Sequence, residues 1–110
     1  MKIQTQTHGQ ATLLITHGPL VAEELVELKR AVETAAKTKR VVIDLADAPY
    51  LDSAGIELLL ELCGMHLPAQ QRPKLAGLTE TCMEALELTD ALPRLEVFDT
   101  VENALRSCQR

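Results

Sequence analysis

Residues 41–56, VVIDLADAPYLDSAGI, contain the pattern that decides the fold. The run Val41–Leu45 is rich in β-branched residues and does not alternate with polar ones, which predicts a strand that is central or covered on both faces. After a short loop, the triplet Ser53–Gly55 opens an apolar helix. A hydroxyl at this point lies at a helix N-terminus, where free backbone N–H groups and the helix dipole favour negative charge.

The residues before this stretch predict a hairpin and a crossover helix. Two extended segments, Ile3–Thr7 and Ala11–Thr16, are separated by a turn that Gly9 permits. One apolar stripe then predicts a helix over Val21–Lys37. Because this helix joins two strands, the strands on either side of it are expected to be parallel neighbours or near neighbours.

The residues that follow the strand at 41–45 predict two more strands and three more helices. The helix that begins at Ser53 is expected to end around Cys63-Gly64. A strand, a T-x-x-E capping box that opens a helix, a short strand and a last helix capped by Asp99-Thr100 follow. The corresponding residues are 74–78, 81–84, 95–98 and 101–105. The order β-β-α-β-α-β-α-β-α predicts one α/β domain over residues 1–110, a mixed sheet of about five strands faced by about four helices.

Composition excludes several classes of function. The net charge is −5, the basic residues are scattered, and Tyr50 and Phe98 are the only aromatic side chains. Nucleic-acid binding needs a basic stripe or stacking rings, so we do not expect it. No apolar run reaches the ~18 residues of a membrane span. The N-terminus also lacks a signal-peptide core, so we expect a cytoplasmic protein with no direct membrane insertion.

The cysteines predict neither a metal site nor disulfides. The chain has three cysteines, Cys63, Cys82 and Cys108. They lie far apart in the sequence, and no two of them form a C-x-x-C pair. We expect reduced thiols, two of them packed on helices, and an exposed Cys108 for which a redox role stays open.

The residues quoted above resemble the STAS domain, the fold of bacterial anti-sigma factor antagonists. The family's hallmark is an Asp-Ser/Thr-x-Gly turn after the central strand, and here the turn is Asp52-Ser53-Ala54-Gly55. The segment from 86 to 105 is similar to the family's closing segment, so the resemblance covers essentially the whole chain. One departure is that Glu57 and Glu61 follow the motif, where many members carry small or apolar residues.

The resemblance implies a regulatory binding protein without enzymatic activity or cofactor. In the family, an anti-sigma factor that is also a serine kinase phosphorylates the Ser or Thr of the turn, and the unphosphorylated antagonist binds that kinase. By position, Ser53 is the phosphoacceptor, Asp52 shapes the turn, and Gly55 allows close approach of a partner backbone. The alternative is a regulatory subunit that docks on the ATPase of an ABC-type (lipid) transporter or on a sensory complex.

The residues themselves leave other roles for Ser53 open. It can cap the helix, which is worth about 1 kcal/mol relative to alanine, or Asp52 can cap it and leave the hydroxyl free. A hydrolase elbow requires glycine two residues before the serine, and Leu51 stands there. The three histidines, His8, His17 and His66, occupy a turn, a loop and a helix end, so we expect no catalytic triad.

Three carboxylates near one strand end, Asp44, Asp47 and Asp52, suggest an alternative magnesium site. We expect them instead to shape the turn or to meet the partner, with no metal.

The helix after Ser53 predicts a partner surface. Its core stripe is expected to be Ile56, Leu59, Leu60 and Cys63. Leu58 and Leu62 lie off this stripe between two glutamates, and we expect them either to be exposed at an interface or to pack under the first helix. The expected partner-contacting residues are Asp47, Tyr50, Asp52, Ser53, Ala54, Gly55, Glu57, Leu58 and Leu62.

The first strand predicts a modest tendency to self-associate. Residues 3–7 can pair with another copy, but Lys2 and the glutamines weaken that tendency, so we expect a monomer or a weak dimer.

Overall fold

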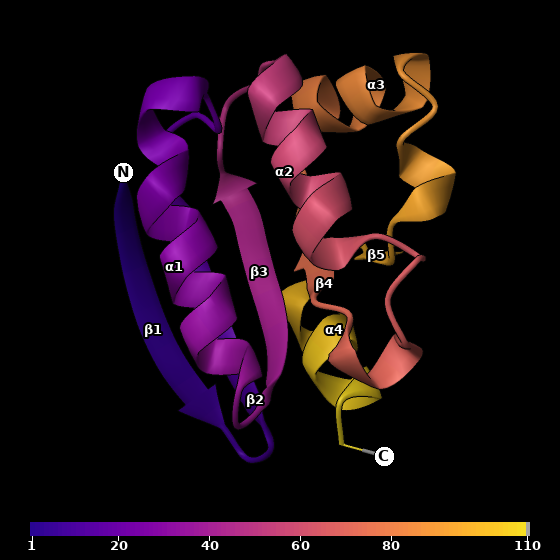
Figure 1. Cartoon of the computed structure of the whole chain (residues 1–110). Coiled ribbons are helices and arrows are strands. Elements are labelled where there is room, and N and C mark those ends of the chain that lie inside the picture. The colour runs from indigo at the N-terminus through magenta and orange to yellow at the C-terminus, as the bar shows by residue number, and fades with distance from the viewer. Residues whose placement is uncertain (110) are drawn as a thin grey trace.

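In the computed structural model, which describes residues 1–109, a five-stranded mixed sheet is covered by helices on both faces (Figure 1). The strands lie in the order β1-β2-β3-β4-β5. The β1–β2 pair is antiparallel and the other three pairs are parallel. The strands are β1 (Lys2–His8), β2 (Ala11–His17), β3 (Arg40–Asp47), β4 (Lys74–Ala76) and β5 (Val97–Phe98).

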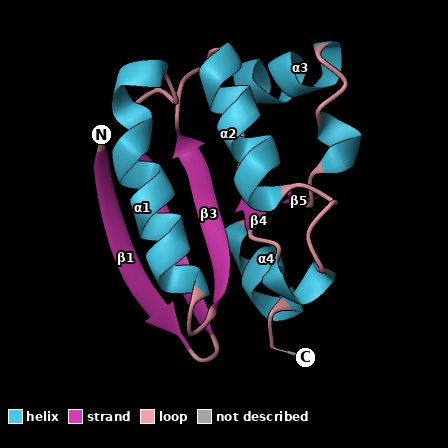
Figure 2. Cartoon of the chain, viewed as in Figure 1, coloured by secondary structure: helices cyan, strands magenta, loops and turns pink. Residues whose placement is uncertain are grey.

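Four α-helices connect or follow the strands (Figure 2). Two of them, α1 and α2, lie side by side on one face of the sheet, and α4 lies on the other. The helices are α1 (Leu25–Ala36), α2 (Ser53–Cys63), α3 (Glu80–Leu88) and α4 (Val101–Ser107). Short 3-10 turns cover Ala22–Glu24, Ala69–Gln71 and Leu92–Arg94.

The alternation of buried side chains along β3 explains the two helical layers. Ile43 belongs to the core that α1, α2 and α3 share with the sheet, whereas its neighbour Val42 packs with Ala104 of α4 and with Cys108 just after that helix. Both strand residues are completely buried. Successive strand side chains point to opposite faces, so a run without polar alternation is buried on both sides. The prediction that 41–45 forms a central strand is confirmed.

The element order, the hairpin, the parallel β2–β3 neighbours and the mixed sheet are confirmed as well. Several boundaries differ from the prediction, and β3 runs to Asp47 where its end was expected at Leu45. The first helix begins with a 3-10 turn at Ala22, and α1 proper begins at Leu25. The fourth strand ends at Ala76, because Gly77 turns the chain with a φ of 71°. The fifth strand is confined to Val97–Phe98.

The predicted capping box at Thr81 is wrong. Thr79 caps α3: its hydroxyl oxygen accepts a hydrogen bond from the Cys82 N–H at 3.2 Å. The same hydroxyl donates to the carbonyl of Ala48, also at 3.2 Å. A contact between two segments far apart in the chain therefore selects the cap, and Thr81 is an exposed residue of the first turn.

The expectation that Cys108 is exposed is also wrong. Cys108 lies just after α4 and packs against the sheet with zero exposure. All three cysteines are free and buried, and burial raises the pKa of the Cys63 thiol to about 12. Because the Cys108 thiol is buried, an oxidant in solution has no direct access to it, which removes the basis for a redox role.

Candidate functional site: the turn at the start of α2

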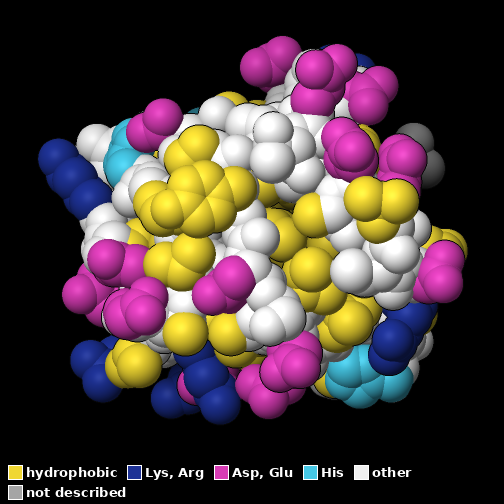
Figure 3. All heavy atoms as spheres, turned by 90° about the horizontal axis from the view of Figure 1, so that it is seen from above, with side chains coloured by type: hydrophobic (Ala, Val, Ile, Leu, Met, Phe, Trp, Pro, Cys, Tyr) yellow, Lys and Arg dark blue, Asp and Glu magenta, His cyan; other side chains and the backbone are white. Residues whose placement is uncertain are grey.

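The candidate site lies at the carboxyl edge of the parallel strands, where the loop from β3 enters α2 (Figure 1). The β2–α1 connection at 18–21 and the β4–α3 connection at 77–79 reach the same edge. Seen from above, apolar side chains gather across the middle of this face and acidic side chains occupy much of its rim (Figure 3). In open sheets of this kind, ligands bind outside the carboxyl ends of the strands.

The main chain of the β3–α2 loop is fixed by hydrogen bonds within the protein. The N–H of Leu20 donates to the carbonyl of Tyr50, and the N–H of Asp52 donates to the carbonyl of Leu20, both at 3.1 Å. The carbonyl of the buried Ala48 accepts from the Thr79 hydroxyl at 3.2 Å and from the Cys82 thiol at 3.3 Å. These three main-chain groups of the loop are therefore held within the protein, and the exposed side chains of the loop are open to solvent.

Asp52 is the N-cap of α2. Its Oδ1 accepts a hydrogen bond from the Gly55 N–H at 2.9 Å, and its Oδ2 accepts from the Ala22 N–H at 3.2 Å. The Gly55 N–H is the main cause that lowers the pKa of Asp52 below its ordinary 3.8, and the Ala22 N–H adds to the effect. One carboxylate thus starts α2 and holds it to the segment that precedes α1.

Ser53 occupies the first position of α2 and is exposed. Within residues 1–109 its hydroxyl makes no hydrogen bond. Of the two capping alternatives that the sequence left open, the structure has Asp52 as the cap and leaves the Ser53 hydroxyl free. The fold does not need this hydroxyl.

Gly55 is buried against its own chain. A Cβ on this residue would lie 2.3 Å from the carbonyl oxygen of Leu20, far inside van der Waals contact. The close approach that requires glycine is therefore between α2 and the segment before α1. Contact of Gly55 with a partner stays a prediction.

The three carboxylates of the suggested metal site each have a different partner. Asp47 pairs with His17, whose Nδ1 lies 2.6 Å from the carboxylate and whose Nε2 lies 2.9 Å from Gln4. Asp44 accepts from the N–H of Ala46 at 3.0 Å. No group of three metal-ligating side chains occurs within the described 109 residues. Sequence reasoning missed the His17–Asp47 pair, because only the β2–β3 register brings these residues together.

Of the two alternatives for Leu58 and Leu62, exposure at an interface is not what the structure has. Leu58 and Leu62 are half-buried and pack against the main core, as the other alternative held. Leu62 also lines a groove between α1 and α2 that includes Val32. Beside it, Glu61 forms an ion pair with Lys29 at 3.3 Å, which joins the two helices.

The expected partner-contacting residues thus fall into three groups of exposure. Asp47, Tyr50, Ser53 and Glu57 are exposed. Asp52, Ala54, Leu58 and Leu62 are half-buried, and Gly55 is buried. Asp47, Tyr50 and Ser53 lie close together in the chain, in the loop and at the start of α2, and half of the Tyr50 surface is open to solvent.

Residues 2–104 match the STAS domain family. The chain belongs to the STAS family. A search of curated proteins finds no match. Within residues 1–109, no helix has the length and apolar character needed to cross a membrane.

Solved structures share the fold at low sequence identity. An anti-sigma factor antagonist from Mycobacterium paratuberculosis is 17% identical, with 99% of this chain and 94% of that chain covered and a TM-score of 0.83. SpoIIAA in its unphosphorylated form is 14% identical, with coverages of 98% and 96% and a TM-score of 0.72. The phosphorylated form of Bacillus SpoIIAA is 15% identical, with coverages of 96% and 98% and a TM-score of 0.63.

A larger protein contains a similar domain. The murine anion transporter Solute Carrier 26 family member A9 is 15% identical and has a TM-score of 0.73. The match covers 94% of this chain and 18% of the transporter. At these identities the likenesses establish the fold.

Proposed function

We propose that this protein is a non-enzymatic antagonist of an anti-sigma factor, and that phosphorylation of Ser53 switches it. In this proposal the partner is a serine kinase that binds the unmodified turn. One observation carries the proposal: Asp52 caps α2, so the exposed Ser53 hydroxyl is free to accept a phosphoryl group without loss of the cap. SpoIIAA, a protein of the same fold, has solved structures in an unphosphorylated and in a phosphorylated form, which is such a pair of states.

The physical effect of a phosphate here follows from its position. It adds about −1.5 to −2 charges near neutral pH and three acceptor oxygens. The N-terminus of α2 tolerates negative charge through its dipole and first-turn N–H groups. The fold is therefore expected to survive, while a partner pressed against the turn meets added bulk and charge beside Asp47 and Asp52.

The partner surface in this proposal is the loop and the first turn of α2. Tyr50 supplies the largest exposed apolar side chain there, and Asp47 and Glu57 supply exposed carboxylates on either side of the turn. Because main-chain groups of the loop are held internally, the loop backbone needs little ordering on binding, which reduces the entropic cost of association. We place the protein in the cytoplasm, with no nucleic acid or cofactor in its function.

A second candidate function is a regulatory subunit of a transporter or sensory assembly. The likeness to one segment of an anion transporter favours it, since a STAS fold is part of a membrane protein there. In this case the same surface docks on a partner such as a transporter ATPase. The two candidates differ in the partner, which gene neighbourhood indicates: a sigma factor and serine kinase for the first, a transporter operon for the second.

The test begins with the tagged protein purified from its native host. The proposal predicts a co-purifying serine kinase and a phosphate on the peptide that contains Ser53, found by mass spectrometry. Ser53→Ala should remove the phosphate and keep partner binding, and Ser53→Asp should weaken binding. Thr38→Asp is the matched control, because it adds the same charge at an exposed turn at the opposite edge of the sheet. The proposal fails if neither Ser53 variant changes phosphate content or affinity.

A further inference from the structure

The outer edge of β1 is a second surface that the proposed function does not use. β1 is the first strand in the sheet order, so one of its edges has no neighbour within the described chain (Figure 1). It pairs with β2 without a bulge, from Lys2 opposite His17 to His8 opposite Ala11. Gln4–Thr7 are exposed. Such an edge can pair with another strand.

The hairpin geometry determines which backbone groups of β1 face outward. The turn has two residues, and Gly9 at its first position has a φ of 60°, as a type II′ turn requires. In such a hairpin the closing pair, His8 and Ala11, exchanges both hydrogen bonds, and the pattern then alternates along the strand. The even-numbered residues of β1 thus bond to β2. The N–H and C=O groups of Ile3, Thr5 and Thr7 point to the free edge.

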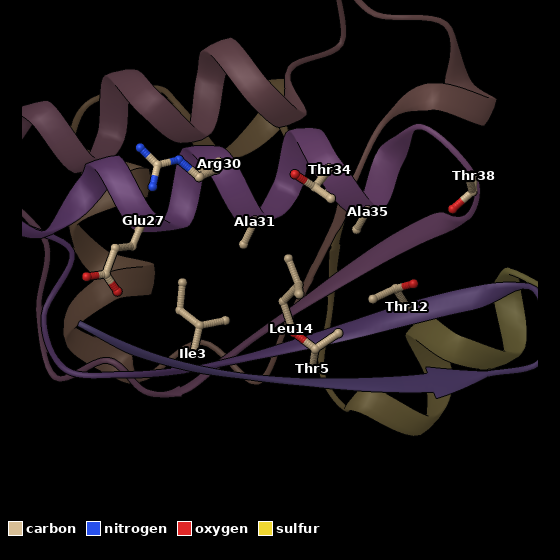
Figure 4. A pocket seen from close by; sticks show the side chains of 10 residues that line it. All are labelled: Ile3, Thr5, Thr12, Leu14, Glu27, Arg30, Ala31, Thr34, Ala35 and Thr38. Carbon is tan, nitrogen blue, oxygen red and sulfur yellow. The ribbon is translucent and has the colours of Figure 1, made fainter.

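The side chains between the ends of β1 do little to block such pairing. Proteins protect exposed edges with prolines, bulges, inward charges or lysines. Residues 3–7, Ile-Gln-Thr-Gln-Thr, contain none of these, and Lys2 stands only at the end. Ile3 and Thr5 extend toward the α1 side of the strand, where they line a groove with Leu14 and Ala31 (Figure 4).

We propose that β1 pairs antiparallel with β1 of a second copy, about a twofold axis at Thr5. In this register Thr5 faces Thr5 of the other copy, Ile3 faces Thr7, and Gln4 faces Gln6. The three pairs formed by Ile3, Thr5 and Thr7 are those with outward groups, and each exchanges two main-chain hydrogen bonds. The two sheets join into one continuous sheet.

The sequence of β1 favours a second copy over an unrelated strand because the strand matches itself when reversed. Thr5 faces Thr5, a pairing that stabilises antiparallel strands, and the pairs of Ile3 with Thr7 and of Gln4 with Gln6 bring no like charges together. Lys2 opposite His8 at each end gives no attraction, so the dimer is weak. In this dimer the two Ser53 turns point to opposite ends of the assembly, and both stay accessible.

A charge-swap experiment tests the register. Sedimentation velocity of the full chain, from micromolar to millimolar concentration, should show a mass that rises toward the dimer. Thr5→Lys and Thr5→Glu each place two like charges opposite each other, so each variant alone should stay monomeric. An equimolar mixture should form a heterodimer at lower concentration than the wild type. Thr81→Lys, the same change on exposed α3, should dimerise as the wild type does.

Hydrogen exchange tests the same register residue by residue. At low concentration the amides of Ile3, Thr5 and Thr7 should exchange fast and those of Gln4 and Gln6 slowly. At high concentration the three odd-numbered amides should become protected in the wild type and stay fast in Thr5→Lys. A wild type that is monomeric throughout, a dimeric Thr5→Lys, or a monomeric mixture would each overturn the proposal. Far-UV circular dichroism confirms that the variants are folded.

Discussion

The turn at Ser53 and the outer edge of β1 are both exposed, yet they offer opposite kinds of chemical group. At the turn, Leu20 and Thr79 bond main-chain groups of the loop and Asp52 caps α2, so the loop offers a partner chiefly its exposed side chains. At β1, the side chains of residues 3–7 are uncharged, and the main-chain groups of Ile3, Thr5 and Thr7 face the free edge. In the proposed function, modification of one exposed side chain alters the first surface. The second surface offers main-chain groups, and the side chains of β1 decide which strand fits them.

The largest effect should come from breaking the backbone frame of the turn. Gly55→Ala places a methyl group 2.3 Å from the Leu20 carbonyl oxygen, and backbone on both sides must move. We expect a loss of about 1–3 kcal/mol or more in the free energy of unfolding. Urea denaturation measures it, with Ala54→Gly as a control that alters the same turn without a clash. An unchanged unfolding midpoint for Gly55→Ala would contradict the buried approach of these segments.

A proline pair distinguishes the inner and outer edges of β1. Gln4→Pro removes an N–H that bonds to β2, and we expect a loss of about 1–3 kcal/mol. Thr5→Pro removes an N–H that points outward, so its loss of stability should be smaller. Urea denaturation of both variants at low concentration, where the protein is monomeric, makes the comparison. Equal losses would mean that the assigned alternation of hydrogen bonds is wrong.

Adjacent substitutions in the turn should separate capping from signalling. Ser53→Ala should change the free energy of unfolding by less than about 0.5 kcal/mol, because the hydroxyl has no partner in the fold. Asp52→Ala removes the cap and the bond to Ala22, so it should be the more destabilising of the two. Thermal unfolding of both variants measures this order. A Ser53→Ala variant as unstable as Asp52→Ala would show that the serine also caps α2.

The smallest predicted effect is a dependence of stability on pH. The pKa of Asp52 is lower in the folded protein than its ordinary 3.8. Its ionised form therefore stabilises the fold above that value, and this contribution is lost as the pH falls through the lowered pKa. The free energy of unfolding, measured from pH 5 downward, should decline less steeply in Asp52→Asn than in the wild type. Identical slopes would contradict the assigned hydrogen bonds of Asp52.

Local patterns predicted the elements of the fold, and contacts between distant segments explain what they missed. The periodicity of apolar residues predicted the strands and helices, because the apolar face of each element must be buried against the core. The choice of Thr79 over Thr81 as a cap depends on Ala48, which is far away in the sequence. Likewise, the burial of Cys108 depends on how α4 lies on the sheet.

The candidate site was predictable in part. The Asp-Ser-x-Gly turn indicated Ser53 and Asp52 directly, since the roles of cap and free hydroxyl belong to neighbouring residues. Two features were not predictable: the close approach of Gly55 to Leu20, and the pairing of His17 with Asp47. Both depend on how β2 and the loop after it pack beside β3. To predict that Leu58 and Leu62 are half-buried, one would have needed the position of α1.

The most direct test of the central claim is the affinity of the purified partner for the unmodified protein and for the protein with phosphoserine at position 53. Calorimetry measures both dissociation constants, and the amide NMR spectrum reports the fold. We expect an intact fold and a partner affinity that phosphorylation weakens by about tenfold or more, which corresponds to about 1.4 kcal/mol. Equal affinities, or a phosphorylated protein that has lost its fold, would contradict it.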